Sequence, residues 1–169
     1  MTAALLAACG SGGARAPGAD AGTDTGAAGD RVDPGAAACS RYQAQIGTAP
    51  SPPYDVVQQI FDDNCTACHS PFADLDLSRG ASYAHIVGHA VPTVESCGGT
   101  LVVPGDPASS YLYQKLTVSH PCAGAQMPLD EFFMSQPLPD CMTAIVRDWT
   151  QAGAQPPSSS TSDGAAPGG

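Results

Sequence analysis

The sequence predicts a mostly α-helical protein, with one small domain between two disordered tails. Three observations lead to this prediction. Apolar residues recur with helical spacing at both ends of the central part of the chain, and no convincing run of alternating residues marks a strand. Gly, Ala, Ser and Pro dominate both ends of the chain, where too few apolar side chains are present to build a core.

Composition divides the 169 residues into four segments. Residues 1–9 read as a truncated signal with a lipobox, and residues 10–50 as a Gly/Ala-rich flexible tether. Residues 51–154 hold the predicted domain, and residues 155–169 form a tail that we expect to be disordered. More than half of residues 10–35 are Gly or Ala, so burial there cannot offset the loss of backbone entropy.

Charge narrows the classes of partner. Asp and Glu outnumber Lys and Arg by 16 to 6, which gives a net charge of −10. This balance excludes nucleic acid as the expected partner, because phosphate binding needs clustered Lys and Arg. No run of 18 apolar residues predicts a membrane span, so we expect membrane contact only through a lipid anchor. The acidic surface predicts a redox partner protein with a basic docking face.

Two helices are predicted at the ends of the domain, over residues 54–64 and 140–152. Their apolar stripes consist of Val56, Val57, Ile60 and Phe61 in the first, and Met142, Ile145, Val146 and Trp149 in the second. Two further helices are expected over residues 78–89 and 107–116, the latter with Asp106 as its N-cap. A short strand at residues 101–103 is the one strand that we retain as an alternative.

The motif that indicates chemistry is CTACH, residues 65–69. The pattern C-x-x-C-H is the attachment signature of c-type haem. Cys65 and Cys68 would form thioethers with the two vinyl groups of one porphyrin, and His69 would be the proximal ligand of the iron. A zinc site and a thioredoxin-like redox pair are the alternatives, but the first needs two further ligands and the second a βαβ context.

Further segments resemble the planctomycete-type cytochrome c domain family. They are ADLDLS at 73–78, VVPGDPASSYLYQKL at 102–116, the pair Met127-Pro128, and IVRDWTQAGA at 145–154. The resemblance covers residues 54–154. It implies a small cytochrome c-like helical domain around one covalently bound haem c, and it assigns the methionine of the Met-Pro pair as distal ligand.

The residues themselves also make Met127 the leading distal ligand, because a loop methionine can place its sulfur over the ring. Met134 and Met142 are weaker candidates, and His120 is the competing histidine. His85 and His89 stand at i, i+4 of a predicted helix, a spacing that can bind a metal but more often is structural.

Four cysteines remain once Cys9 and the haem pair are set aside. An even number favours two disulfides in an oxidising compartment, with three possible connectivities. We favour Cys97–Cys122, which brackets the central helix, and Cys39–Cys141, which ties the N-terminal approach to the last helix.

The first nine residues, MTAALLAAC, resemble a bacterial lipobox that ends at Cys9. The resemblance implies lipidation of Cys9 and an exported protein, in the periplasm or cell envelope, with the outer membrane favoured. The segment lacks a basic region and is short, which fits a true start upstream. An Ala-rich terminus with an incidental cysteine is the alternative.

The predicted function is transfer of single electrons between exported redox partners by a monohaem c-type cytochrome, so a carrier rather than an enzyme. Two alternatives stay open. One is a haem-based enzyme or ligand sensor with an open distal site, and the other is a non-haem, disulfide-stapled binding module at the cell surface. The haem hypothesis also predicts a cavity between the motif and Met127.

Overall fold

The computed structural model describes residues 34–71, 74–91 and 98–158. These ranges hold five helices and no strand, so the predicted mostly helical class is confirmed. The helices are α1 (Pro34–Ile46), α2 (Tyr54–Asn64), α3 (Ser82–Ile86), α4 (Tyr111–Thr117) and α5 (Asp140–Gln151). Most of the two predicted tails, residues 1–33 and 159–169, lies outside the described residues. Among the described helices, none has the length and apolar character to cross a membrane.

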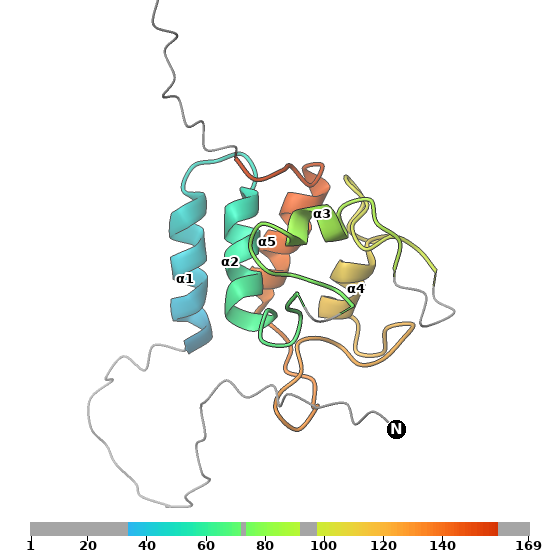
Figure 1. The fold of residues 1–169 in the computed structure, drawn as a ribbon. Helices are drawn as coiled ribbons and strands as arrows, with labels where there is room; N and C mark the ends of the chain where they lie inside the picture. Colours follow the sequence, from blue (N-terminus) through green and yellow to red (C-terminus); the bar gives the residue numbers. More distant parts are fainter. Residues whose placement is uncertain (1–33, 72–73, 92–97, 159–169) are drawn as a thin grey trace, which may run out of the picture.

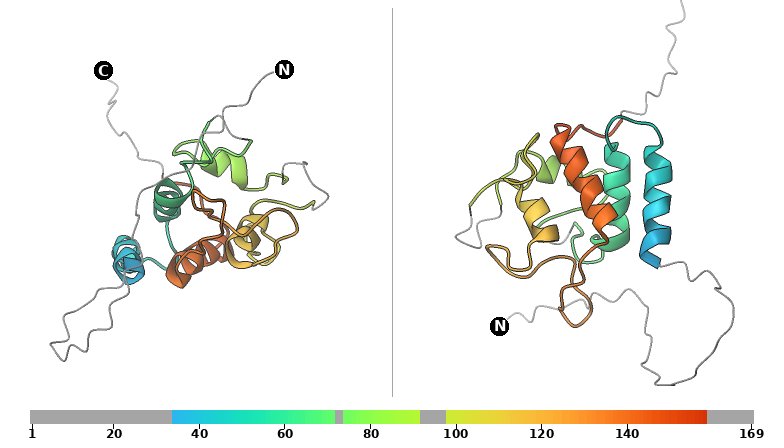
Figure 2. Two further views of the ribbon diagram at one scale, coloured as in Figure 1. Left: turned by 90° about the horizontal axis from the view of Figure 1, so that it is seen from below. Right: turned by 180° about the vertical axis from the view of Figure 1, so that it is seen from behind.

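Helices α1, α2 and α5 lie side by side, with α2 antiparallel to the other two (Figure 1). Helix α4 packs on α5 at the side away from α1, as the view from below also shows (Figure 2). The start of α1, the end of α2 and the start of α5 therefore meet at one end of the molecule. We call it the motif end, because residues 65–69 follow α2 there.

The core forms where the predicted stripes of α2 and α5 meet. All eight stripe residues are buried, and Trp149 is fully enclosed. Its ring lies 5.2 Å from that of Tyr54, which in turn stacks edge-on against Tyr83 at 5.1 Å. Tyr54 lies in α2, Tyr83 in α3 and Trp149 in α5, so this aromatic cluster joins the three helices.

Residues 34–46 form helix α1, whereas the sequence predicts a flexible tether through residue 50. The folded part begins by Pro34, because α1 docks on α2 and α5. Tyr42 is fully buried and its hydroxyl donates a 2.7 Å hydrogen bond to the carboxylate of Asp63. Alanine has a high intrinsic helix propensity, and tertiary contacts decide whether the helix forms. An Ala-rich stretch can therefore be either a flexible tether or a docked helix.

The middle of the chain is more irregular than predicted. Helix α3 is shorter than residues 78–89, because Gly80 and Gly88 adopt positive φ on either side of it. Helix α4 starts at Tyr111, since the residues before it form a turn in which the Asp106 carboxylate accepts the Ser109 N–H. Residues 101–103 pair only through an isolated bridge of Val102 with Val87.

At the C-terminal side, the first residue of the predicted tail, Gln155, contacts the folded part. The Gln155 carbonyl accepts the indole N–H of Trp149 at 2.9 Å, so this residue belongs to the folded part.

Candidate functional site

The CTACH motif forms one extra turn beyond the end of α2. The Cys65 N–H donates to the Phe61 carbonyl at 2.8 Å, and the His69 N–H donates to the Cys65 carbonyl at 2.9 Å. Cys65, Cys68 and His69 are thus spaced i, i+3, i+4 on one helical turn, which places their side chains on the same side of it. The C-x-x-C-H spacing therefore corresponds to one hydrogen-bonded turn of the backbone.

Cys65 is partly buried against the hydrophobic core and is a free thiol. Burial raises its pKa to about 12, and the nearby Asp62 carboxylate acts in the same direction. A thiol that stays protonated at neutral pH is a poor thiolate nucleophile, and Cys65 does not pair with Cys68. Both facts weigh against a catalytic cysteine and against a dithiol redox pair.

His69 is half-buried at the end of the same turn. Burial lowers the pKa of its imidazole, the Lys115 ammonium lowers it further, and a hydrogen bond with the backbone of Leu75 opposes both. The imidazole is consequently neutral at neutral pH, which is the form that binds a metal. Its backbone is held by a 2.9 Å hydrogen bond from the Leu77 N–H to the His69 carbonyl.

Cys68 is exposed, unlike Cys65 and His69, and is disulfide-bonded in the structure. A thioether requires a thiol, so this disulfide has to be reduced before Cys68 can react with a vinyl group. The motif thus contains one thiol that is free and one that reduction must release.

Met127 lies partly buried against the core, in the segment that follows α4. The last turn of α4 holds this segment by several hydrogen bonds. The Met127 N–H donates to the Lys115 carbonyl at 2.7 Å, and the Lys115 ammonium donates to the carbonyls of Ala123 and Ala125 at 2.9 and 2.7 Å. The amide of Gln126 adds a bond to the Leu116 carbonyl at 2.9 Å.

Lys115 has a role in the fold that the sequence does not indicate. In the structure it braces the Met127 segment and also acts on the His69 imidazole. Its ammonium therefore bonds to the Met127 segment and lowers the pKa of the predicted proximal ligand. A lone lysine in an amphipathic helix gives no signal of this role.

The competing distal ligands differ from Met127 in their burial. Met142 is 5% exposed within the core stripe of α5, whereas Met134 is 63% exposed. His120 is exposed and its ring nitrogen contacts the Ser119 hydroxyl at 3.1 Å. Met127 alone among these four is partly buried next to the core and held by α4.

His85 and His89 line a cavity of about 240 Å³ with two acidic residues, Asp74 and Asp76. The cavity therefore brings two carboxylic side chains to the predicted histidine pair. Even so, the described part of the chain holds no group of three His, Cys, Asp or Glu side chains placed to bind a metal ion.

Two cavities lined by described residues lie away from the motif, and the cavity predicted between the motif and Met127 stays a prediction. The larger, of about 430 Å³, lies between α1, α5 and the α1–α2 loop, and the smaller is the one beside His85. Neither is lined by Cys65, His69 or Met127.

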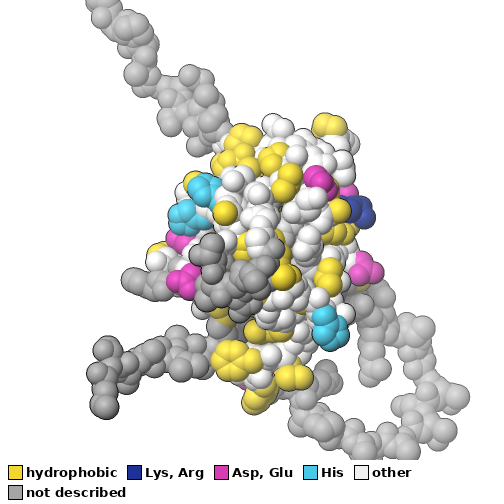
Figure 3. Space-filling model, turned by 90° about the vertical axis from the view of Figure 1, so that its right-hand side faces the viewer, with side chains coloured by type: hydrophobic (Ala, Val, Ile, Leu, Met, Phe, Trp, Pro, Cys, Tyr) yellow, Lys and Arg dark blue, Asp and Glu magenta, His cyan; other side chains and the backbone are white. Residues whose placement is uncertain are grey.

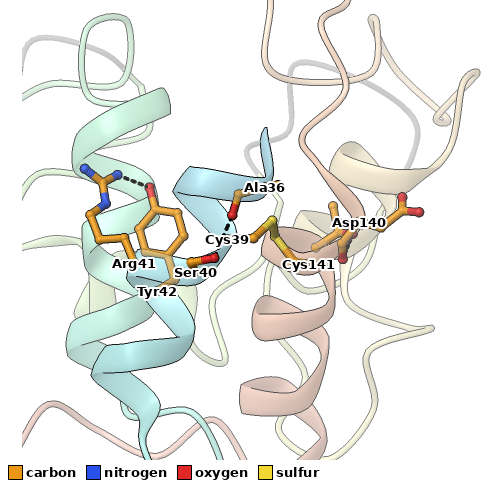
Figure 4. Close-up of a disulfide and its surroundings, with 8 residues drawn as sticks. Ala36, Cys39, Ser40, Arg41, Tyr42, Asp140 and Cys141 are labelled. Carbon is orange, nitrogen blue, oxygen red and sulfur yellow. Dashed lines mark hydrogen bonds between the residues drawn. A yellow bond between two sulfur atoms is a disulfide. The ribbon is translucent and has the colours of Figure 1, made fainter. Parts of the chain in front are cut away.

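One of the two favoured disulfides is present. Cys39 in α1 and Cys141 in the first turn of α5 are bonded, with Cα atoms 5.9 Å apart and a sequence separation of 102 (Figure 4). Cys122 is also disulfide-bonded, and Cys97, its predicted partner, lies outside the described residues. Cys9, the predicted lipidation site, lies outside them as well.

Comparison with known proteins adds no relative from which a function could be carried over. No protein-family model, no curated protein and no solved structure matches this chain.

Proposed function

We propose that this protein is a monohaem c-type cytochrome that carries single electrons, exported and anchored to the cell envelope through a lipidated Cys9. The observation that carries the proposal is the geometry of CTACH. The motif continues α2 by one turn, so that two cysteines and a histidine share one side of it. The resemblance of residues 54–154 to planctomycete-type cytochrome c domains points to the same small cytochrome c-like fold.

The chain's own residues would divide the work as follows. Cys65 and Cys68 would hold haem c by thioethers, and His69 would offer a neutral imidazole as proximal ligand. Bound in this way, the haem supplies an iron that alternates between ferric and ferrous states. Helix α2 fixes the three side chains relative to the core, because its other face is packed against α5.

Met127 would be the distal ligand. A thioether ligand raises the reduction potential relative to two histidines. The support is that α4 fixes the backbone at both ends of residues 123–127, through Lys115 and through Gln126. The Lys115 ammonium also lowers the pKa of the His69 imidazole, which favours its neutral, iron-binding form.

The partner would be a redox protein with a basic docking face. Each of the three described arginines is paired with an aspartate, in Arg41–Asp63, Arg79–Asp62 and Arg147–Asp148. The remaining described cation, Lys115, is directed at backbone carbonyls. Each described arginine is therefore neutralised by a neighbouring aspartate. The remaining negative charges would steer a partner with a basic surface towards the protein.

The test is covalent haem attachment during expression of the full chain with cytochrome c maturation machinery. We expect haem to stay on the denatured chain, with a mass increase of one haem. Cys65→Ala and Cys68→Ala should each retain a single thioether, seen as a red-shifted pyridine haemochrome band, and the double variant should lose covalent haem. The matched control is Cys39→Ala with Cys141→Ala, which removes two cysteines outside the motif and should keep both thioethers. A colourless parent protein would refute the proposal.

A further inference from the structure

Three consecutive large apolar side chains are exposed on the loop that precedes α5. Phe132, Phe133 and Met134 are 75%, 63% and 63% exposed. We call these three residues the apolar tip. Scattered exposed apolar residues are ordinary, but three adjacent ones, two of them aromatic, keep a continuous apolar surface in water.

The apolar tip is held in place by its own loop. One carboxylate oxygen of Asp130 accepts the backbone N–H groups of Phe132 and Met134, both at 2.9 Å. The other carboxylate oxygen accepts the amide of Gln136 at 3.0 Å. Below these bonds, Leu129 and Ser135 pair across the base of the loop.

Phe133 adopts φ of +59°, a left-handed conformation that bulky residues seldom take. The loop therefore keeps an unfavourable backbone state while it turns both phenylalanines outward.

The loop projects from the motif end of the molecule, as both side views show (Figure 1, Figure 2). Apolar side chains gather at this same lower end in the space-filling view (Figure 3). The start of α1 lies at this end too, so residues 1–33 join the folded part on the side from which the apolar tip projects.

We infer that the apolar tip inserts into the interfacial region of a lipid bilayer, the one to which the chain before Pro34 is anchored. The inference rests on the lipid-anchor part of the proposed function and is independent of haem attachment. Phenylalanine partitions favourably into the bilayer interface. Glu131 and the net charge of −10 oppose binding to anionic lipid, so the fitting surface is a zwitterionic one.

Two phenylalanines and a methionine bind a bilayer only weakly by themselves. An anchor at the N-terminus changes this, because it holds the tip near the bilayer at a high effective concentration. The tip would then orient the domain, with the motif end towards the membrane and the α1–α2 loop away from it.

The experiment places tryptophan probes in the full chain. Phe132→Trp reports on the tip, and Gln151→Trp is the matched control, exposed at the opposite end of α5. The native Trp149 is fully buried and gives a constant background. Each chain carries Cys9→Ser and an N-terminal His-tag, and is held on phosphatidylcholine vesicles by a small fraction of nickel-chelating lipid. Native lipidation is thus not needed for the test, and haem content is recorded separately.

We expect emission from the Phe132→Trp chain to shift to the blue on vesicle attachment and to be quenched by brominated acyl chains. The Gln151→Trp chain should show neither change. If the tryptophan at position 132 keeps the emission wavelength of a water-exposed indole and is still quenched by aqueous acrylamide, the inference is overturned. A protein partner would then be the alternative occupant. Lipid quenching seen only in haem-free protein would also overturn it, since the tip would then cover the haem.

Discussion

Two regions of the molecule hold the predicted haem ligands by different means. The helical half consists of α1, α2 and α5 with the CTACH turn, and the loop half consists of α4 and the segment that leads to Met127. Helices α1, α2 and α5 are joined by a buried core and the Cys39–Cys141 bond, and the CTACH turn simply extends one of them. The Met127 segment has no such frame and is held by side chains that bond to backbone carbonyls, above all Lys115. The proximal side should therefore resist perturbation, whereas the distal side should respond to single substitutions.

The largest expected effect comes from the disulfide that closes the helical half. The double variant Cys39→Ser with Cys141→Ser should lose about 4 kcal/mol of unfolding free energy, because the bond closes a loop of 102 residues and limits the unfolded chain. Urea denaturation of haem-free protein measures this loss. We expect the segment around Met127 to lose no more stability than the rest of the domain.

A loss well below 1 kcal/mol would contradict this account of the helical half. It would mean that α1 is held by Tyr42 and the core alone.

Next in size is the brace of the loop half. Lys115→Met should cost about 2 kcal/mol, because it leaves the half-buried carbonyl of Ala125 without its donor and that of Ala123 with the Tyr111 hydroxyl alone. It should also weaken distal ligation while covalent haem attachment is unchanged. Denaturation and the visible spectrum measure the two effects. Lys115→Arg is the matched control, since it keeps a charged donor, and equal behaviour of the two variants would show that the brace is unimportant.

The smallest effect concerns a buried phenol in the helical half. Burial raises the pKa of Tyr54 to about 12, from an ordinary value of about 10. Its contribution to stability is therefore complete below pH of about 10 and is lost as the pH rises towards 12. Tyr54→Phe should cost about 1 kcal/mol at neutral pH, through the lost hydrogen bond to Ser82, and should flatten the alkaline decline. An unchanged alkaline limb in pH-dependent denaturation would contradict the assignment.

The same contrast explains what could be predicted from sequence. Helices α2 and α5 follow from apolar periodicity, because each has one face against the core, and the predicted and observed bounds agree closely. The Cys39–Cys141 bond was favoured from the even number of remaining cysteines and their positions. These features depend on local spacing or on simple pairing.

Features that depend on tertiary contacts were not predicted. Helix α1 lies in an Ala-rich stretch whose docking is decided by Tyr42 and a distant carboxylate. The brace by Lys115 joins residues eight and ten positions apart through a side chain that resembles any surface lysine. The turn after Asp106 replaces a helix start, because the Ser110 hydroxyl bonds the Asp106 carbonyl at 2.7 Å.

The most direct test of the account asks whether a helix-borne histidine and a loop-borne methionine bind one iron. The measurement is the far-red methionine–iron band of the oxidised, haem-loaded full chain. We predict that the band is present in the parent protein, absent in Met127→Ala, and retained in Met134→Ala, whose exposed methionine lies on the same connection. A band that survives Met127→Ala, or a haem protein without the band, would contradict ligation by Met127 and with it the pairing of the two halves.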